Sequence, residues 1–133
     1  MLKCNHYVSQ GGSILKILYH PDKADIHLSS ILYALSDPVR LSIVAEISRI
    51  GECTCGGIDA NVVKSTLSHH VRTMREAGVV QVRVQGTQRF LSIRSADLEE
   101  RFPGLLSSIL NAYAGSNEPI SNVTEASCRT TKT

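Results

Sequence analysis

Apolar residues recur with helical spacing through the first half of the chain. After Asp25, the i, i+3, i+4, i+7 spacing of one helix face is followed by Leu28, Ile31, Leu32 and Leu35. A second helix is predicted to begin at Asp37, whose side chain can cap it, with Pro38 at the first helical position, where no N–H is needed. This helix is expected to end at Gly51, and its predicted inward stripe consists of Leu41, Val44, Ala45 and Ser48.

The pattern then changes from helix to hairpin. The segment "GECTCGGIDANVV" is irregular, and its glycines lower helix propensity, so at most two helical turns are expected there. A helix is predicted from Lys64 to Ala77, with Gly78 ending it. In "VVQVRVQGTQRFLSIR" the valines alternate with polar residues, which predicts a β-hairpin with its turn around "QGTQ".

Further helical structure is predicted after the hairpin. Ser95 is a candidate cap for a helix with acidic residues in its first turn, and Pro103 is expected to interrupt that helix. The stripe that follows is more apolar than that of a surface helix and consists of Leu105, Leu106, Ile109, Leu110 and Tyr113. Such a stripe indicates burial in the core or pairing with a second chain.

The length of 133 residues is typical of one domain with tails. Residues 24–114 carry the regular pattern, and residues 1–23 form an N-terminal extension with a candidate short helix. Residues 115–133 are polar and aperiodic, and they are predicted to be a disordered tail. Neither a signal peptide nor an apolar stretch of membrane-spanning length is recognised, so a cytoplasmic protein with reduced cysteines is expected.

The distribution of charge tells more than the net charge of +2. Residues 64–94 hold six Lys or Arg residues and one acidic residue, whereas the segments on both sides hold more acidic than basic residues. A basic centre between acidic flanks favours a local surface for an anionic partner. The alternative interpretation is an ordinary solvated face.

Two adjacent histidines lie within the helix predicted at 64–77. Neighbours in a helix point in different directions, so His69 and His70 cannot chelate one metal ion from a regular helix. His70 falls on the apolar side, where we expect a packed ring bonded to the backbone. His69 falls among hydroxyl and cationic side chains, a face that can bond phosphates and read base edges in a major groove.

The order of elements is that of a winged helix-turn-helix, a mainly α fold with a β-hairpin wing. A helix pair, a helix with a polar face and a basic hairpin follow one another in the sequence. The candidate DNA contacts on the helix are Lys64, Ser65, Thr66, Ser68, His69 and Arg72. Those on the hairpin are Arg83, Gln85, Thr87 and Arg89.

Two stretches together, "LYALSDPVRLSIVAEI" and "STLSHHVRTMREAGVVQVRVQGTQRFLSI", resemble the ArsR/SmtB family of winged-helix repressors. The resemblance covers about residues 24–110. It implies a homodimer built largely on the first and last helices. It also implies sequence-specific binding to double-stranded operator DNA at an imperfect palindrome, with repression relieved by an inducer.

Metal sensors of this family often carry a Cys-x-Cys near the position of Cys53 and Cys55. Soft thiolates suit arsenic(III) or a divalent soft metal as the inducer, with Cys4 as a candidate third ligand. The pair is one residue out of register with the family, and Ile58 occupies a possible third cysteine position. Three interpretations stay open: a metalloid sensor, a thiol redox switch, and cysteines without a sensing role.

An enzyme is not expected. The sequence contains no nucleophile–base–orienter set, no paired carboxylates and no phosphate-binding glycine loop. The alternative to a DNA-binding regulator is a winged-helix protein-interaction module without specific DNA binding.

Overall fold

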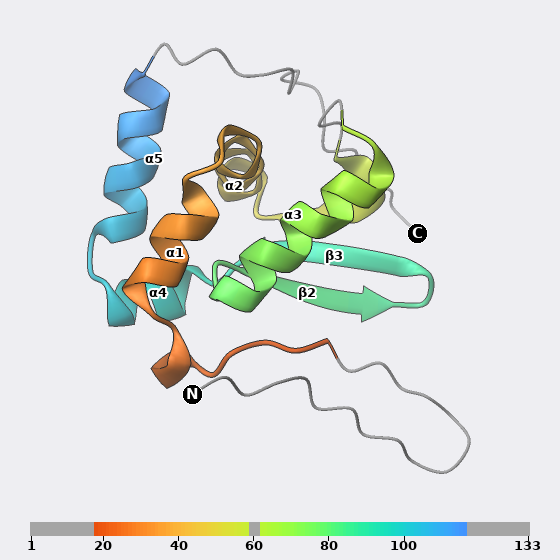
Figure 1. Cartoon of the computed structure of the whole chain (residues 1–133), viewed down its shortest axis with the longest axis horizontal. Helices are drawn as coiled ribbons and strands as arrows, with labels where there is room; N and C mark the ends of the chain where they lie inside the picture. Colours follow the sequence, from red (N-terminus) through yellow and green to blue (C-terminus); the bar gives the residue numbers. More distant parts are fainter. Residues whose placement is uncertain (1–17, 59–61, 117–133) are drawn as a thin grey trace.

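The computed structural model describes residues 18–58 and 62–116, which form a mainly helical fold with one small sheet (Figure 1). The elements in chain order are η1 (Lys23–Asp25), α1 (Leu28–Leu35), α2 (Pro38–Ile50), β1 (Glu52–Thr54), η2 (Cys55–Gly57), α3 (Lys64–Ala77), β2 (Val80–Gln85), β3 (Gln88–Ile93), α4 (Ser95–Arg101) and α5 (Leu105–Gly115). Figure 1 shows the hairpin tip at one end of the molecule and α5 at the other. Residues 1–17 and 117–133 lie outside the described residues, so the predicted short helix near Ile14 and the predicted tail are not tested.

The local signals for the central helices are confirmed. Asp37 caps α2, since its Oδ1 accepts hydrogen bonds from the backbone N–H groups of Val39 at 2.8 Å and Arg40 at 3.1 Å. Pro38 is the first residue of α2, and Gly51 follows its last residue with φ of 93°. The helix α3 spans Lys64–Ala77 as predicted, and the hairpin turn falls between Gln85 and Gln88.

The predicted inward stripe of α2 is wrong for most of its positions. Val44 is buried, but Leu41 and Ala45 are only partly buried and Ser48 is exposed. The buried residues of α2 are Arg40, Ser42, Ile43, Val44 and Ile47. The reason is that α2 packs on β1 and β3 as well as on α1 and α3, and this turns the Ile43–Ile47 side inward. Helical periodicity alone does not select between two partly apolar faces.

The sheet has a third strand that periodicity did not predict. The strand β1 pairs antiparallel with β3, Cys53 lying opposite Leu91, and the strand order is β1-β3-β2. Three residues are too few to show an alternating pattern, so pairing with β3 decides their conformation. The expected helical turns of this region reduce to the single 3-10 turn η2 in the described residues.

The C-terminal helices differ from prediction at one cap. Ser95 is the first residue of α4 rather than its cap, and Arg94 occupies the capping position without a side-chain cap bond. Pro103 lies between α4 and α5, as expected, and Gly104 turns the chain there with φ of 76°. Within the described residues no single helix is long and apolar enough to cross a membrane. Only α1 and α2 taken together reach that length and hydropathy, and a bend of 100° separates them.

Gly78 links α3 to β2 and lies directly against the core. Its φ is 90°, and a Cβ at this position would lie 2.7 Å from Cγ1 of Ile26, which is fully buried. We expect Gly78→Ala to lower the free energy of unfolding by about 3 kcal/mol, since backbone strain and overpacking add. Urea unfolding followed by circular dichroism measures the loss.

Gly51→Ala is the matched control for this prediction. Gly51 has φ of 93°, but a Cβ there would meet nothing within 4 Å, so only the strain remains. Its expected cost is about 1 kcal/mol. Equal losses in the two variants would show that Ile26 moves aside without cost.

Candidate nucleic-acid interface

The helix α3 divides into a polar side and a packed side, as its sequence predicts. Its packed side consists of His70, Val71, Met74 and Ala77. Thr66 is partly buried, and the exposed candidates are Lys64, Ser65, Ser68, His69 and Arg72. The structure therefore brings five of the six candidate contacts of α3 together on its solvent side.

His70 is packed as expected, but its predicted backbone partner is wrong. The ring is 8% exposed, and its Nδ1 lies 3.2 Å from Nη1 of Arg40. A guanidinium only donates hydrogen bonds, so Nδ1 of His70 must accept and the neutral ring carries its proton on Nε2. Burial lowers the pKa of His70, the nearby cation of Arg40 lowers it further, and Asp37 acts in the opposite direction.

Arg40 ties three helices together from inside the core. It is 6% exposed, and its Nε donates to the carbonyl of Ala34 at 2.7 Å. Its Nη2 donates to the carbonyl of Tyr33 at 3.2 Å, and both carbonyls belong to the last turn of α1. Carbonyls at a helix C-terminus lack partners within the helix, and a cation is favourable there. Sequence reasoning missed this role, although an arginine between apolar residues in "PVRLSIV" is a signal for it.

His69 and Arg72 extend the polar side. The rings of His69 and His70 are tilted by 55° with centroids 6.0 Å apart, and only His70 is buried. Nε of Arg72 donates to Oε1 of Glu76 at 2.9 Å, one turn along α3. Exposed pairs of this kind contribute only about 0.3–0.5 kcal/mol, so a phosphate can replace Glu76 as the partner of Arg72.

The two arginines of the hairpin lie on opposite faces of the sheet. Successive residues of a strand alternate between faces, and Arg89 pairs with Val84 while Arg83 pairs with Phe90. Arg89 therefore shares the face of the buried Val82, which α3 covers. In the described part of the chain the guanidinium of Arg89 makes no hydrogen bond or ion pair.

Arg83, by contrast, is held against the sheet. It donates to Oε1 of Glu52 at 2.9 Å and to Oε1 of Gln85 at 2.7 Å, and its guanidinium lies 4.4 Å from the ring centroid of Phe90. These contacts tie the hairpin to β1. Thr87 is exposed at the turn, and Figure 1 shows the turn at the same end of the molecule as the start of α3.

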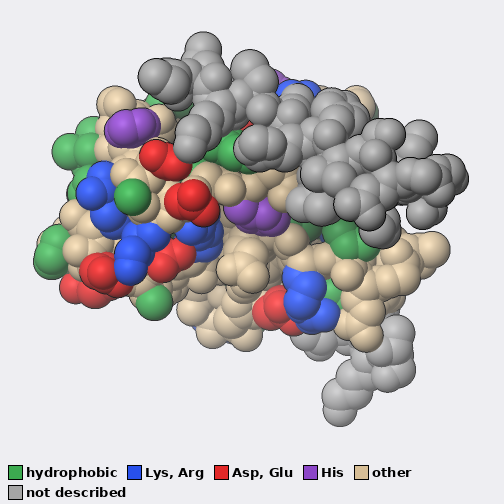
Figure 2. Space-filling view, turned by 90° about the horizontal axis from the view of Figure 1, so that it is seen from below, with side chains coloured by type: hydrophobic (Ala, Val, Ile, Leu, Met, Phe, Trp, Pro, Cys, Tyr) green, Lys and Arg blue, Asp and Glu red, His purple; other side chains and the backbone are tan. Residues whose placement is uncertain are grey.

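A second face of the molecule carries balanced charge. Figure 2 shows Lys and Arg side chains next to Asp and Glu side chains on this face. Lys23 pairs with Glu100 at 2.7 Å, and Arg94 pairs with Asp97 at 2.9 Å. Alternating charges of this kind attract a polyanion weakly, so the polar side of α3 is the better candidate surface.

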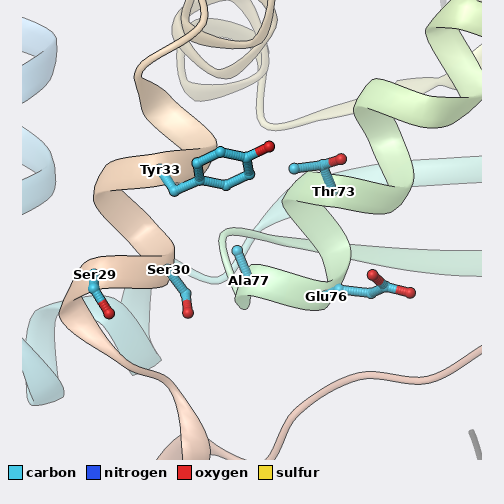
Figure 3. Close-up of a pocket in the computed structure, with 6 residues that line it drawn as sticks. All are labelled: Ser29, Ser30, Tyr33, Thr73, Glu76 and Ala77. Carbon is cyan, nitrogen blue, oxygen red and sulfur yellow. The ribbon is translucent and has the colours of Figure 1, made fainter. Parts of the chain in front are cut away.

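A hollow of about 370 Å³ lies between α1 and α3 (Figure 3). Its lining is made mostly of hydroxyl side chains and consists of Ser29, Ser30, Tyr33, Thr73, Glu76 and Ala77. Figure 3 shows the Tyr33 ring reaching from α1 toward α3. The Glu76 carboxylate is already paired with Arg72, so this hollow offers no free charge that would select an ion.

The cysteine pair lies in β1 and η2. Cys53 is 1% exposed within β1 and is disulfide-bonded, so the expectation that the cysteines are reduced is wrong for this residue. Cys55 is a partly buried free cysteine in η2. Burial raises the pKa of the Cys55 thiol, with Arg89 acting in the opposite direction. Among the described residues no group of three or more His, Cys, Asp or Glu side chains can hold a metal ion, and Cys4 lies outside them. The metal and redox hypotheses therefore stay predictions.

Comparison with known proteins gives consistent results. A helix-turn-helix domain model matches residues 35–83. YceK of Bacillus subtilis, an uncharacterized HTH-type transcriptional regulator, is 36% identical over 84 residues, which are 61% of this chain and 84% of YceK. MJ1325 of Methanocaldococcus jannaschii, described in the same words, is 36% identical over 67 residues, which are 49% of this chain and 75% of MJ1325.

Two solved structures share the winged-helix fold. An ArsR family transcriptional regulator superposes with a TM-score of 0.50 at 19% identity, over 67% of this chain and 92% of that chain. HlyU from Vibrio cholerae superposes with a TM-score of 0.53 at 21% identity, over 69% of this chain and 92% of that chain.

Proposed function

Because the chain belongs to the HTH-type transcriptional regulators, we propose that it is a sequence-specific DNA-binding repressor that acts as a homodimer and leaves its operator when an inducer binds. The observation that carries this proposal is the exposed polar side of α3, with Arg89 on the hairpin face that α3 covers. A single helix fits a B-DNA major groove, and a hairpin with a basic arm reaches the adjacent backbone or minor groove.

The roles of individual side chains follow from their chemistry. The hydroxyls of Ser65 and Ser68 and the ring of His69 can donate to phosphates or base edges. Lys64 and Arg72 supply charge at opposite ends of this surface. Arg89 supplies the charge of the hairpin, whereas Arg83 is engaged with Glu52 and positions β1 against the hairpin.

Homodimer formation is supported by apolar surface on α1 and α5. Leu28 is 45% exposed, Leu32 is 48% exposed and Tyr33 is 65% exposed. None of the α5 residues is fully buried, although its apolar stripe packs partly on the core. Figure 1 shows α1 and α5 away from the hairpin tip, so pairing of these helices leaves α3 open to DNA.

A gel-shift titration with a fragment of its own promoter tests the proposal. We expect specific retention that weakens with increasing salt, because phosphate contacts release counterions. Arg89→Ala should weaken binding by about threefold to tenfold, and Arg83→Ala by less than about twofold. Retention of no fragment in reducing buffer over a range of salt would instead favour the protein-interaction module. A larger loss for Arg83→Ala than for Arg89→Ala would reverse their proposed roles.

The inducer is proposed to act through Cys53 and Cys55, as a thiol oxidant or reductant that changes the Cys53 disulfide, or as arsenic(III) or a divalent soft metal once Cys53 is reduced. This location is supported by the pairing of β1 with β3, since a change at β1 or η2 is transmitted to the hairpin. The raised pKa of Cys55 disfavours its thiolate, so binding must first overcome burial. Addition of arsenite or an oxidant to the same gel-shift assay distinguishes these inducers.

A further inference from the structure

Residues 18–22, which we call the N-terminal strap, bond to three elements of the winged-helix fold. Arg75 of α3 donates to the carbonyl of Tyr19. The backbone N–H of Val82 in β2 donates to Nε2 of His20 at 3.0 Å. Arg94, between β3 and α4, donates to the carbonyl of Pro21 at 2.6 Å. The strap therefore connects α3 with the hairpin, and Figure 1 shows it running below both.

The strap lies on the open edge of the sheet. The strand order β1-β3-β2 leaves β2 with one neighbouring strand, so alternate N–H groups of β2 point away from the sheet. The imidazole of His20 accepts from one of these groups, that of Val82, whose side chain is buried on the inner face. A side chain thus supplies one of the hydrogen bonds that a further strand would make.

The hydrogen bonds of His20 define its tautomer. Its Nδ1 lies 3.0 Å from the carbonyl oxygen of Leu18, which only accepts, so Nδ1 carries the proton. Its Nε2 accepts from Val82 and must be unprotonated. A second proton on Nε2 would place two N–H groups against each other and break this bond.

We propose that His20 is a positioning residue that ties the hairpin to the strap, and through Arg75 to α3, and that protonation of its Nε2 releases the hairpin. The effect on DNA affinity rests on the proposed function, because α3 and the hairpin are its two DNA-reading elements. The contact between His20 and Val82 does not depend on that function.

The charges around His20 favour its neutral form. Burial is the largest cause that lowers its pKa, and the cations of Arg75 from α3 and Arg94 from the β3–α4 junction lower it further. The bond to Leu18 acts in the opposite direction, and Asp97 pairs with Arg94. The stability contributed by the neutral ring is complete above the ordinary value of 6.5 and is lost as the pH falls below it.

Nuclear magnetic resonance titration of the whole chain tests the contact without DNA. In the wild type, the pKa of His20 should lie below its ordinary value of 6.5, and the Val82 amide shift should follow the His20 midpoint. His20→Phe fills the space without an acceptor, so hydrogen exchange of the Val82 amide should be about threefold to tenfold faster. His27→Gln is the control and should leave Val82 unchanged. A Val82 amide that responds to neither the His20 titration nor His20→Phe would overturn the proposal.

DNA affinity measured at pH 7.5 and pH 5.5 tests the positioning role. His20→Gln keeps an acceptor that does not titrate, so we expect affinity near that of the wild type at the higher pH. At the lower pH the wild type should lose about threefold to tenfold more affinity than this variant. Equal pH dependence of the two proteins would overturn the positioning role. Absence of specific binding by the wild type would contradict the repressor proposal. The titration and hydrogen exchange of the Val82 amide would still test the contact between His20 and Val82.

Discussion

Replacing Ser68 and His69 together by alanine is expected to weaken operator binding by about 30-fold to 160-fold, since each lost contact to phosphate or base costs about 1–1.5 kcal/mol. Both side chains are exposed on α3, so their removal leaves the core intact. The loss should depend on DNA sequence if either side chain reads a base edge, and it should be uniform if both bond phosphates. Fluorescence anisotropy titrations at fixed salt, with operator and scrambled duplexes, distinguish the two cases.

The matched control carries the same two residue types away from α3. His27 and Ser48 are exposed, and His27→Ala/Ser48→Ala should leave both affinity and melting temperature nearly unchanged. Thermal melting of the Ser68→Ala/His69→Ala variant should also match the wild type. Unchanged DNA affinity in this variant would remove α3 as the reading element and favour the protein-interaction module.

Arg40→Met is expected to lower the free energy of unfolding by about 3 kcal/mol, because it removes the donor to the buried carbonyl of Ala34 and the buried partner of His70. The carbonyl of Tyr33 loses one donor but keeps those of Ser36. Methionine fills much of the space of the arginine stem, so the loss reports hydrogen bonding more than a cavity. Against a total stability of about 5–15 kcal/mol for a domain of this size, such a loss is large. Urea unfolding at pH 7.5 measures it.

Arg49→Met is the control for Arg40→Met. Arg49 lies on the same helix, but its side chain is exposed and pairs with Glu46, so its expected cost is below about 1 kcal/mol. Similar losses in the two variants would contradict the role of Arg40 as the donor to α1.

The pKa of His70 gives a second readout of the same variant. Arg40 is one of the causes that lower this pKa, so Arg40→Met should move it part of the way back toward 6.5 while burial still lowers it. In the wild type, the stability contributed by neutral His70 is lost as the pH falls below 6.5, and in the variant this loss should be smaller. A proton titration of the His70 ring by nuclear magnetic resonance measures the shift.

The elements and the division of α3 were predictable because both are encoded by local spacing. The cap at Asp37, the stop at Gly78 and the alternation of valines in the hairpin act over a few residues, and the structure confirms each of them. The separation of His69 from His70 follows from helix geometry alone. The inward face of α2 was not predictable in this way, since two faces of that helix carry apolar residues.

The sequence by itself determined that this chain is a winged helix-turn-helix protein whose polar helix and basic hairpin form the candidate surface for DNA. Only the tertiary structure decided how side chains from distant segments are used. It placed Arg40 beneath α1, paired β1 with β3, separated Arg83 from Arg89, and bonded His20 to the edge of β2. The physical reason is that periodicity reports which side of an element is apolar, whereas the partner of a polar group depends on which elements meet in space.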